Sequence, residues 1–235
     1  TLAGADTEEK VAQLVGSVND FEGTEDVPSV AAICVYPNFV KTVREVLTAS
    51  GVQVACVSGA FPASQSFTEV KIAETALAIA AGADEIDIVL NLGAFLSGDY
   101  LEASTEIEEQ KATARGALLK VILETGALKE PELIRRASIL ALFSGADFLK
   151  TSTGKEYPGA DLRAAYILCS VLREYKDKYG EQRGVKFSGG IRSAEEAVKY
   201  YTLVEAILGK EWLDNRFFRI GASSLVGSLQ QEILG

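Results

Sequence analysis

Four ionisable side chains stand within or at the end of short apolar segments, where burying a charge is expensive. In chain order they are Asp87, Lys120, Lys150 and Lys186, each on a different segment. A lysine can lay its stem along an apolar surface and keep its ammonium in water. That explanation serves for one such lysine but fits three in successive segments poorly, so we treat the four residues as one candidate constellation.

Such a constellation suits the chemistry of a nucleophilic amine. A lysine ammonium has an ordinary pKa of about 10.4 and no free lone pair. Burial and a neighbouring cation both lower that pKa, and the neutral amine can then attack a carbonyl and form a Schiff base. The protonated Schiff base stabilises the carbanion left by carbon–carbon cleavage. A carboxylate such as Asp87 can shuttle the protons, directly or through a bound water.

The composition excludes several other chemistries. The chain of 235 residues contains no histidine, which removes serine–histidine–aspartate and cysteine–histidine triads and histidine-ligated zinc. Cys34, Cys56 and Cys169 lack metal-ligand spacing, and each lies in an apolar stretch. We therefore expect buried, reduced thiols in a cytoplasmic protein, with no metal and no cofactor.

The charge and hydropathy patterns bear on partners and location. The formal net charge of −10 opposes nonspecific binding to nucleic acid, although a small anionic substrate stays compatible if basic residues converge locally. The longest apolar runs, such as Ala76–Ala81, are too short to span a membrane, and no signal peptide is recognisable. Because the chain starts at Thr1 and has no methionine, we expect a clipped N-terminus.

Short apolar strands alternate with amphipathic helices along the chain. The strands are rich in Val, Ile, Leu and Phe and bounded by Gly, Pro or Ser, which is typical of buried parallel strands. Asp6 or Thr7 is expected to cap the first helix, and Ser193 with Glu196 to form a capping box. The expected strands span Val30–Val35, Val52–Val57, Glu85–Leu90, Leu118–Leu123, Ala146–Lys150, Gly184–Phe187 and Phe217–Ile220. The expected helices span Thr7–Val15, Phe39–Ala49, Thr68–Ala80, Tyr100–Arg115, Pro131–Leu142, Leu162–Lys178, Ala194–Tyr201 and Ser224–Ile233.

This order predicts an α/β fold, a (β/α)8 TIM barrel forming a single domain over residues 1–235. Only seven strands are visible, so the first strand is expected to be clipped, with Thr1–Leu2 as its last residues. A doubly wound open sheet is the alternative, but no Gly-x-Gly-x-x-Gly follows the first strand. A barrel places its active site at the C-terminal strand ends. Strand alternation then points Asp87 and Lys120 inward.

Glycine-rich turns after the last three strands suggest a phosphate site. Ser152–Gly154 with Lys155 follows one strand, Ser188–Arg192 the next and Ile220–Leu225 the last. Glycine lets the backbone approach a ligand closely, and the free N–H groups of a helix start attract anions. A Gly-Gly pair also fits an ordinary turn, and the two serines before the last helix also fit simple caps.

Five motifs resemble those of deoxyribose-phosphate aldolase, in the expected order and over essentially the whole chain: ADEIDIVLNLGAFLSGD, LLKVILETGAL, GADFLKTSTGK, VKFSGGIRSAEEA and RIGASSL. The K-T-S-T-G-K block is the most specific. The resemblance implies a metal-free class I aldolase that reversibly cleaves 2-deoxy-D-ribose 5-phosphate into D-glyceraldehyde 3-phosphate and acetaldehyde, in deoxyribonucleotide catabolism. It also implies a cytoplasmic homodimer whose partners are the sugar phosphate and acetaldehyde, with no nucleic acid and no membrane.

The same resemblance implies a role for each site residue. Lys150 is similar to the Schiff-base lysine, and Lys186 to the neighbour that lowers its pKa. Asp87 is similar to the proton-relay aspartate, and Lys120 to an additional active-site lysine. The substrate and phosphate site implied in this way comprises Cys34, Thr153, Gly154, Lys155, Gly189, Gly190, Arg192, Gly221, Ser223 and Ser224.

Some positions depart from the family pattern, among them Phe61–Phe67 and Phe95-Leu96, and two other functions compete. Phe61–Phe67 lacks the glycines that family members usually carry there, which could alter the mouth of the pocket. A different sugar-phosphate enzyme, such as a transaldolase or an isomerase with a carboxylate base, is the second hypothesis. A barrel without activity that serves as a binding subunit is the third, and the complete set of buried charges argues against it.

Overall fold

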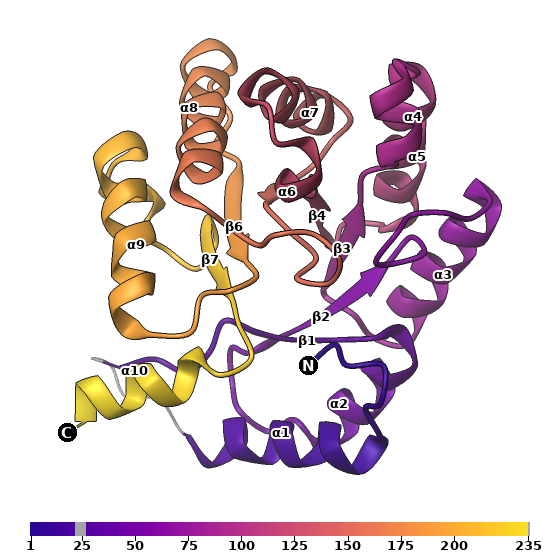
Figure 1. Cartoon of the computed structure of the whole chain (residues 1–235). Helices are drawn as coiled ribbons and strands as arrows, with labels where there is room; N and C mark the ends of the chain where they lie inside the picture. Colours follow the sequence, from indigo (N-terminus) through magenta and orange to yellow (C-terminus); the bar gives the residue numbers. More distant parts are fainter. Residues whose placement is uncertain (22–26, 235) are drawn as a thin grey trace.

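The computed structural model describes residues 1–21 and 27–234. Its centre is a parallel sheet of seven strands that follow one another in sequence order. Figure 1 shows the sheet curled into a half-barrel with helices on its outer side. The strands are β1 (Ala32–Val35), β2 (Gln53–Ser58), β3 (Glu85–Val89), β4 (Leu118–Ile122), β5 (Phe148–Lys150), β6 (Gly184–Ser188) and β7 (Phe218–Gly221).

Each strand is followed by at least one helix, as parallel neighbours require a crossover. The α-helices are α1 (Glu8–Asp20), α2 (Val40–Val46), α3 (Thr68–Ala80), α4 (Leu92–Ser97), α5 (Tyr100–Thr113), α6 (Thr125–Leu128), α7 (Pro131–Phe143), α8 (Leu162–Tyr179), α9 (Ala194–Leu208) and α10 (Leu225–Leu234). Two short 3₁₀ helices are η1 (Pro37–Phe39) and η2 (Lys210–Trp212). None of the helices formed by the described residues is long and apolar enough to cross a bilayer.

The predicted alternation of strands and helices is confirmed, with errors at helix ends. All seven predicted strands are present, but α9 continues to Leu208 instead of ending at Tyr201. The predicted capping box of Ser193 and Glu196 starts that helix. At the start of α1 the cap is Thr7. The short helices α4 and α6 were not predicted, because six and four residues are too few to show a helical period.

The predicted direction of the side chains on the central strands is also confirmed. Ile86, Ile88 and Val121 belong to the apolar core between the sheet and the helices. Asp87 and Lys120 are fully buried on the opposite face of the sheet, inside the curl. Because strand side chains alternate between faces, this single register decides which residues can meet inside the curl.

The N-terminal residues do not form the expected strand end. Thr1 and Leu2 have no strand structure, and the residues that the structure describes contain no eighth strand. The amino group of Thr1 donates a hydrogen bond of 2.8 Å to the carbonyl oxygen of Cys34 on β1. All three cysteines are free thiols; Cys56 and Cys169 are buried as predicted, whereas Cys34 is only half-buried.

Candidate active site

The strand register brings the four predicted residues to the same side of the sheet. Asp87 on β3 is the direct partner of Lys120 on β4. Lys150 on β5 is the direct partner of Lys186 on β6, which in turn faces Arg219 on β7. In-register residues of parallel strands point to the same face. The four side chains therefore converge inside the curl.

Asp87 is the centre of this cluster. Its Oδ1 accepts a hydrogen bond of 2.8 Å from Lys120 Nζ. Its Oδ2 accepts two, each of 2.8 Å, from Lys150 Nζ and Lys186 Nζ. All four residues are buried. One carboxylate is thus shared by three amines in a site with little access to water.

Lys150 and Lys186 make the same contact with Asp87 but differ in the direction in which their pKa values are shifted. Burial lowers the pKa of Lys150, the Asp87 carboxylate opposes the shift, and Lys186 adds to it, so that the pKa lies below its ordinary value. Burial also acts to lower the pKa of Lys186, but there the attraction of Asp87 prevails and the pKa is raised. Lys150 is therefore the amine disposed to be neutral, and Lys186 the one that keeps its charge.

Asp87 itself is held as a carboxylate. Burial would raise its pKa, but the charges of Lys120, Lys150 and Lys186 outweigh burial and keep the pKa well below its ordinary value. An ionised Asp87 can accept a proton from a reacting group and return it. Cys34 on the edge strand β1 lies between Ile33 and Val35 of the apolar core, so alternation turns its side chain to the inside of the curl, where the cluster lies.

Two further charged residues join the cluster, and the sequence analysis gave neither a role. Glu85 Oε2 accepts a hydrogen bond of 2.6 Å from Lys120 Nζ. Glu85 Oε1 accepts one of 3.0 Å from Arg219 Nη2. Alternation along β3 already indicated that Glu85 faces inward with Asp87. Nothing in the sequence indicated that Arg219, 134 residues away, meets Glu85.

Glu124 anchors the loop that follows Lys150. It has left-handed backbone torsions (φ of 53°) just after β4, and its side chain is buried. Its carboxylate accepts hydrogen bonds from the Thr153 backbone N–H (3.2 Å) and the Thr153 hydroxyl (2.5 Å). Burial raises the pKa of Glu124 even though these hydrogen bonds oppose the shift. Thr153 is therefore held in place by a residue that the sequence analysis left without a role.

The glycines of the predicted phosphate site lie on adjacent loops. A Cβ on Gly189 would stand 2.8 Å from the Cα of Gly159 and 3.5 Å from that of Gly154. Gly189 also has a φ of 86°, which disfavours other residues. A Cβ on Gly221 would lie 2.9 Å from Lys186 Cε, so this glycine lets β7 pack against the lysine stem.

The remaining residues of the predicted phosphate site are less tightly placed. Lys155 Nζ donates a hydrogen bond to the carbonyl oxygen of Leu2. Arg192 is exposed, and its backbone N–H donates to Glu196 Oε2 at 2.7 Å. Gly190, directly after Gly189, has a φ of 90°. Ser223 and Ser224 are exposed and immediately precede α10.

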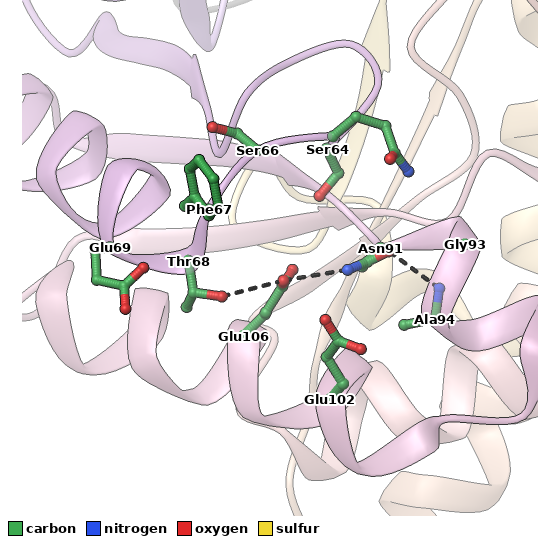
Figure 2. Close-up of a pocket in the computed structure, with 11 residues that line it drawn as sticks. Ser64, Ser66, Phe67, Thr68, Glu69, Asn91, Gly93, Ala94, Glu102 and Glu106 are labelled. Atoms are coloured by element: carbon green, nitrogen blue, oxygen red, sulfur yellow. Dashed lines mark hydrogen bonds between the residues drawn. The ribbon is translucent and has the colours of Figure 1, made fainter.

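The structure also has a polar cavity outside the curl, at the rim between α3 and α5. Its volume is about 450 Å³, and it contains none of the predicted site residues. Figure 2 shows Thr68 and Asn91 converging on Glu106, whose Oε1 accepts hydrogen bonds of 3.3 Å and 3.1 Å from them. Its Oε2 forms an ion pair of 2.6 Å with the buried Lys71. The cavity is thus bordered by a second buried ammonium–carboxylate pair.

Comparisons with known proteins agree on one family. A model of the DeoC/LacD family aldolases matches residues 3–229. A Caenorhabditis elegans protein named "Putative deoxyribose-phosphate aldolase" is 39% identical over 228 residues, which are 96% of this chain and 75% of that protein.

Solved structures give the same result. The crystal structure of a "putative deoxyribose-phosphate aldolase" from Coccidioides immitis superposes with a TM-score of 0.83 at 29% identity, covering 99% of this chain and 82% of that one. A deoxyribose phosphate aldolase from Aeropyrum pernix, whose structure is described as tetrameric, has a TM-score of 0.74 at 28% identity, covering 100% of this chain and 88% of that one.

Proposed function

Because the chain belongs to the DeoC/LacD family of aldolases, we propose that it reversibly cleaves 2-deoxy-D-ribose 5-phosphate into D-glyceraldehyde 3-phosphate and acetaldehyde through a Schiff base on Lys150. The observation that carries the proposal is the sharing of Asp87 by Lys120, Lys150 and Lys186. Glu85 also pairs with Lys120, but among the described residues Lys150 and Lys186 have Asp87 as their one ion-pair partner. One carboxylate cannot neutralise both of these ammonium groups in a buried site, so one amine is driven to release its proton. The relatives' names support the choice of substrate.

The reaction begins at the neutral amine of Lys150. It attacks the aldehyde carbon of the open-chain sugar and forms a carbinolamine, which takes up one proton and loses one water to give a protonated imine. The C2–C3 bond then breaks: its electron pair moves toward the imine and forms an enamine, while the C3 hydroxyl loses its proton and becomes the aldehyde of glyceraldehyde 3-phosphate. The enamine takes up a proton at C2, and water releases acetaldehyde and regenerates Lys150.

The neighbouring charges divide the remaining work. Asp87, held as a carboxylate by its three partners, accepts and returns the protons, directly or through water. Lys186 keeps its charge and thereby disfavours a second charge on Lys150. Lys120 binds the other oxygen of Asp87 and keeps that carboxylate ionised.

The substrate phosphate is bound at the loops after β5, β6 and β7. The glycines Gly154 and Gly189 let the loops after β5 and β6 pack closely against each other, and the start of a helix such as α10 presents backbone N–H groups to an anion. The basic residues Lys155 and Arg192 follow these loops and supply positive charge. The proposed contacts comprise Thr153, Gly154, Lys155, Gly189, Gly190, Arg192, Gly221, Ser223 and Ser224.

The curled sheet of seven strands supports a (β/α)8 barrel as the complete architecture, because strand order and crossover helices follow that pattern. The homodimeric state, the cytoplasmic location and the place in deoxyribonucleotide catabolism stay predictions of the sequence.

The test is covalent trapping. The protein is incubated with acetaldehyde and borohydride, digested, and the modified peptide is identified by mass spectrometry. We expect the adduct on the peptide that contains Lys150, and its loss in Lys150→Ala. An adduct on the Lys120 or Lys186 peptide would contradict the assignment of roles, and absence of any adduct would favour an isomerase that uses a carboxylate base.

A second measurement tests the substrate. Acetaldehyde release from 2-deoxy-D-ribose 5-phosphate is compared with release from unphosphorylated 2-deoxy-D-ribose. We expect turnover of the phosphorylated sugar and much weaker turnover of the free sugar, with the difference mainly in KM. Trapping of acetaldehyde without turnover of the phosphorylated sugar would support the assignment of the Schiff-base lysine and contradict the proposed substrate.

A further inference from the structure

The ion pairs of the cluster continue from Lys120 to Glu85 on β3 and from Glu85 to Arg219 on β7. Lys120 Nζ lies 2.8 Å from Asp87 Oδ1 and 2.6 Å from Glu85 Oε2, and Arg219 Nη2 lies 3.0 Å from Glu85 Oε1. We propose that Arg219 and Glu85 are positioning residues that act through Lys120 and Asp87 to keep the Lys150 amine uncharged. This inference rests on the proposed function.

Charge balance shows why Arg219 matters. Even with Lys150 neutral, the connected group holds two carboxylates against three cations. Without Arg219 the two carboxylates would be matched by two cations, and a charge on Lys150 would meet less opposition. The guanidinium stays charged at any working pH, so it is a constant source of positive potential. Both Arg219 and Glu85 are largely or fully buried, so water screens them little.

The orientation of Arg219 is fixed by contacts other than Glu85. Its Nε donates a hydrogen bond to the carbonyl oxygen of Asn215. Its guanidinium carbon stands 5.9 Å from the centre of the Phe148 ring, and Lys120 Nζ stands 6.0 Å from the same centre. The ring thus contacts both cations, while Glu85 joins them by hydrogen bonds. These contacts orient Arg219 so that it binds Glu85 Oε1, and Glu85 Oε2 is the oxygen that binds Lys120.

The pair lies away from the loops that would bind substrate. Glu85 and Arg219 line a cavity of about 860 Å³ at the N-terminal ends of the strands, together with Gln53 and Leu118, the first residues of β2 and β4. Lys150, the last residue of β5, does not line this cavity, and its Nζ donates to Asp87 Oδ2. Substitutions of the pair can therefore change the electrostatics of Lys150 without removing a substrate contact.

The pH dependence of Lys150 involves charged groups from several elements. These are Asp87 on β3, Lys120 on β4, Glu124 after β4, Lys186 on β6, the amino group of Thr1 beside β1, and the more distant Glu85 and Arg219. Loss of Arg219 removes a positive charge and leaves Glu85 to Lys120 alone, which weakens the hold of Lys120 on Asp87. Both effects favour the charged form of Lys150. Loss of the Glu85 charge acts in the opposite direction.

The experiment measures the rate of borohydride trapping by acetaldehyde as a function of pH, because this readout needs neither the phosphate nor the sugar. In Arg219→Gln we expect the acidic limb of the profile to move to higher pH, with trapping slower by about three- to tenfold at a fixed pH on that limb. In Glu85→Gln we expect a shift to lower pH. The double variant should return close to the parent profile, because the two charges cancel.

Two controls separate this role from a structural one. Arg216→Gln removes the same charge from the same cavity, but Arg216 pairs with Asp214 at the surface, so the profile should not move. Arg219→Lys keeps the charge and should keep the parent profile even if Arg219→Gln folds poorly. Equal profiles in the parent, Arg219→Gln and Glu85→Gln would overturn the inference and leave the proposed function intact. Absence of trapping in the parent at every pH would overturn the proposed function itself.

Discussion

Two buried lysine–carboxylate sites lie on either side of β3, and they differ in the number of cations for each carboxylate. Outside the curl, Lys71 forms a one-to-one ion pair with Glu106, and the other oxygen of that carboxylate accepts hydrogen bonds from Thr68 and Asn91. Inside the curl, three lysines share Asp87. Both sites are buried and both have hydrogen bonds of ordinary length. The two sites therefore share burial and differ in the ratio of cations to carboxylates, and the reactivity proposed for Lys150 depends on that difference.

The two sites accordingly have different uses for the protein. The balanced pair of Lys71 and Glu106 holds α3 against α5. Removing one partner leaves the other charge buried without a counter-charge. An unbalanced group favours release of a proton, and removing one cation relieves it. Matched substitutions of Lys71 and Lys150 can test this difference directly.

The largest expected effect is on activity, in Lys150→Met. We expect kcat/KM for 2-deoxy-D-ribose 5-phosphate to fall by at least about a thousandfold, because the nucleophile is lost. Stability should change little, since Lys120 and Lys186 still pair with Asp87. The measurements are steady-state kinetics and urea unfolding of the same preparation. If Lys150→Met keeps its activity, Lys150 is not the nucleophile. If it no longer folds, Lys150 is needed for stability, as Lys71 is expected to be, and the proposed difference between the two sites is wrong.

The matched substitution Lys71→Met should do the reverse. It leaves the Glu106 carboxylate buried without a cation, which costs about 3–5 kcal/mol in the free energy of unfolding. The rate of acetaldehyde trapping per folded molecule should stay at the parent value, because Lys71 does not touch the Asp87 cluster. Adding Glu106→Gln to Lys71→Met should recover much of the lost stability. A large loss of trapping in folded Lys71→Met would mean that the sites are coupled.

A smaller effect is expected in Lys186→Leu, which reduces the excess of cations by one. The Lys150 pKa should rise, because a neighbouring positive charge disappears and Asp87 Oδ2 is left to Lys150 alone. Since the proposed reaction needs Lys150 as the neutral amine, it should slow by about tenfold at neutral pH and its optimum should move upward. A pH–rate profile of the variant beside the parent gives the answer, and an unmoved profile would argue against this role of Lys186.

The smallest effect concerns Glu124, a buried carboxylate without a buried cation of its own. Its pKa is raised by burial in the folded state, so its contribution to stability is complete below its unfolded pKa and is lost as pH rises through the folded value. Glu124→Gln keeps an acceptor for Thr153 and has no charge to bury. We expect the variant to gain thermal stability relative to the parent as the pH rises from the ordinary glutamate pKa of about 4.3 toward neutrality. A constant difference in Tm across that range would show that Glu124 does not titrate there.

Prediction from the sequence succeeded for features that the residue pattern of a single strand determines. The hydrophobic period located all seven strands, and alternation along β3 and β4 placed Asp87 and Lys120 inside the curl. It missed α4 and α6, which end within one or two turns, and it left Glu85, Glu124 and Arg219 without roles. Each of those roles depends on a partner far away in the chain or on an unusual backbone torsion.

The amino-acid sequence by itself determined the kinds of chemistry available. The absence of histidine left Lys, Asp, Glu, Tyr, Cys or water for acid–base work, and the order of apolar segments put Asp87 and three lysines on successive strands. Only the tertiary structure decided how the charges are shared. Register and the curl of the sheet bring three ammonium groups onto one carboxylate and place Arg219 against Glu85. Proton affinity inside a protein depends on distances of a few ångströms between groups that the chain separates widely, and only the folded sheet sets those distances.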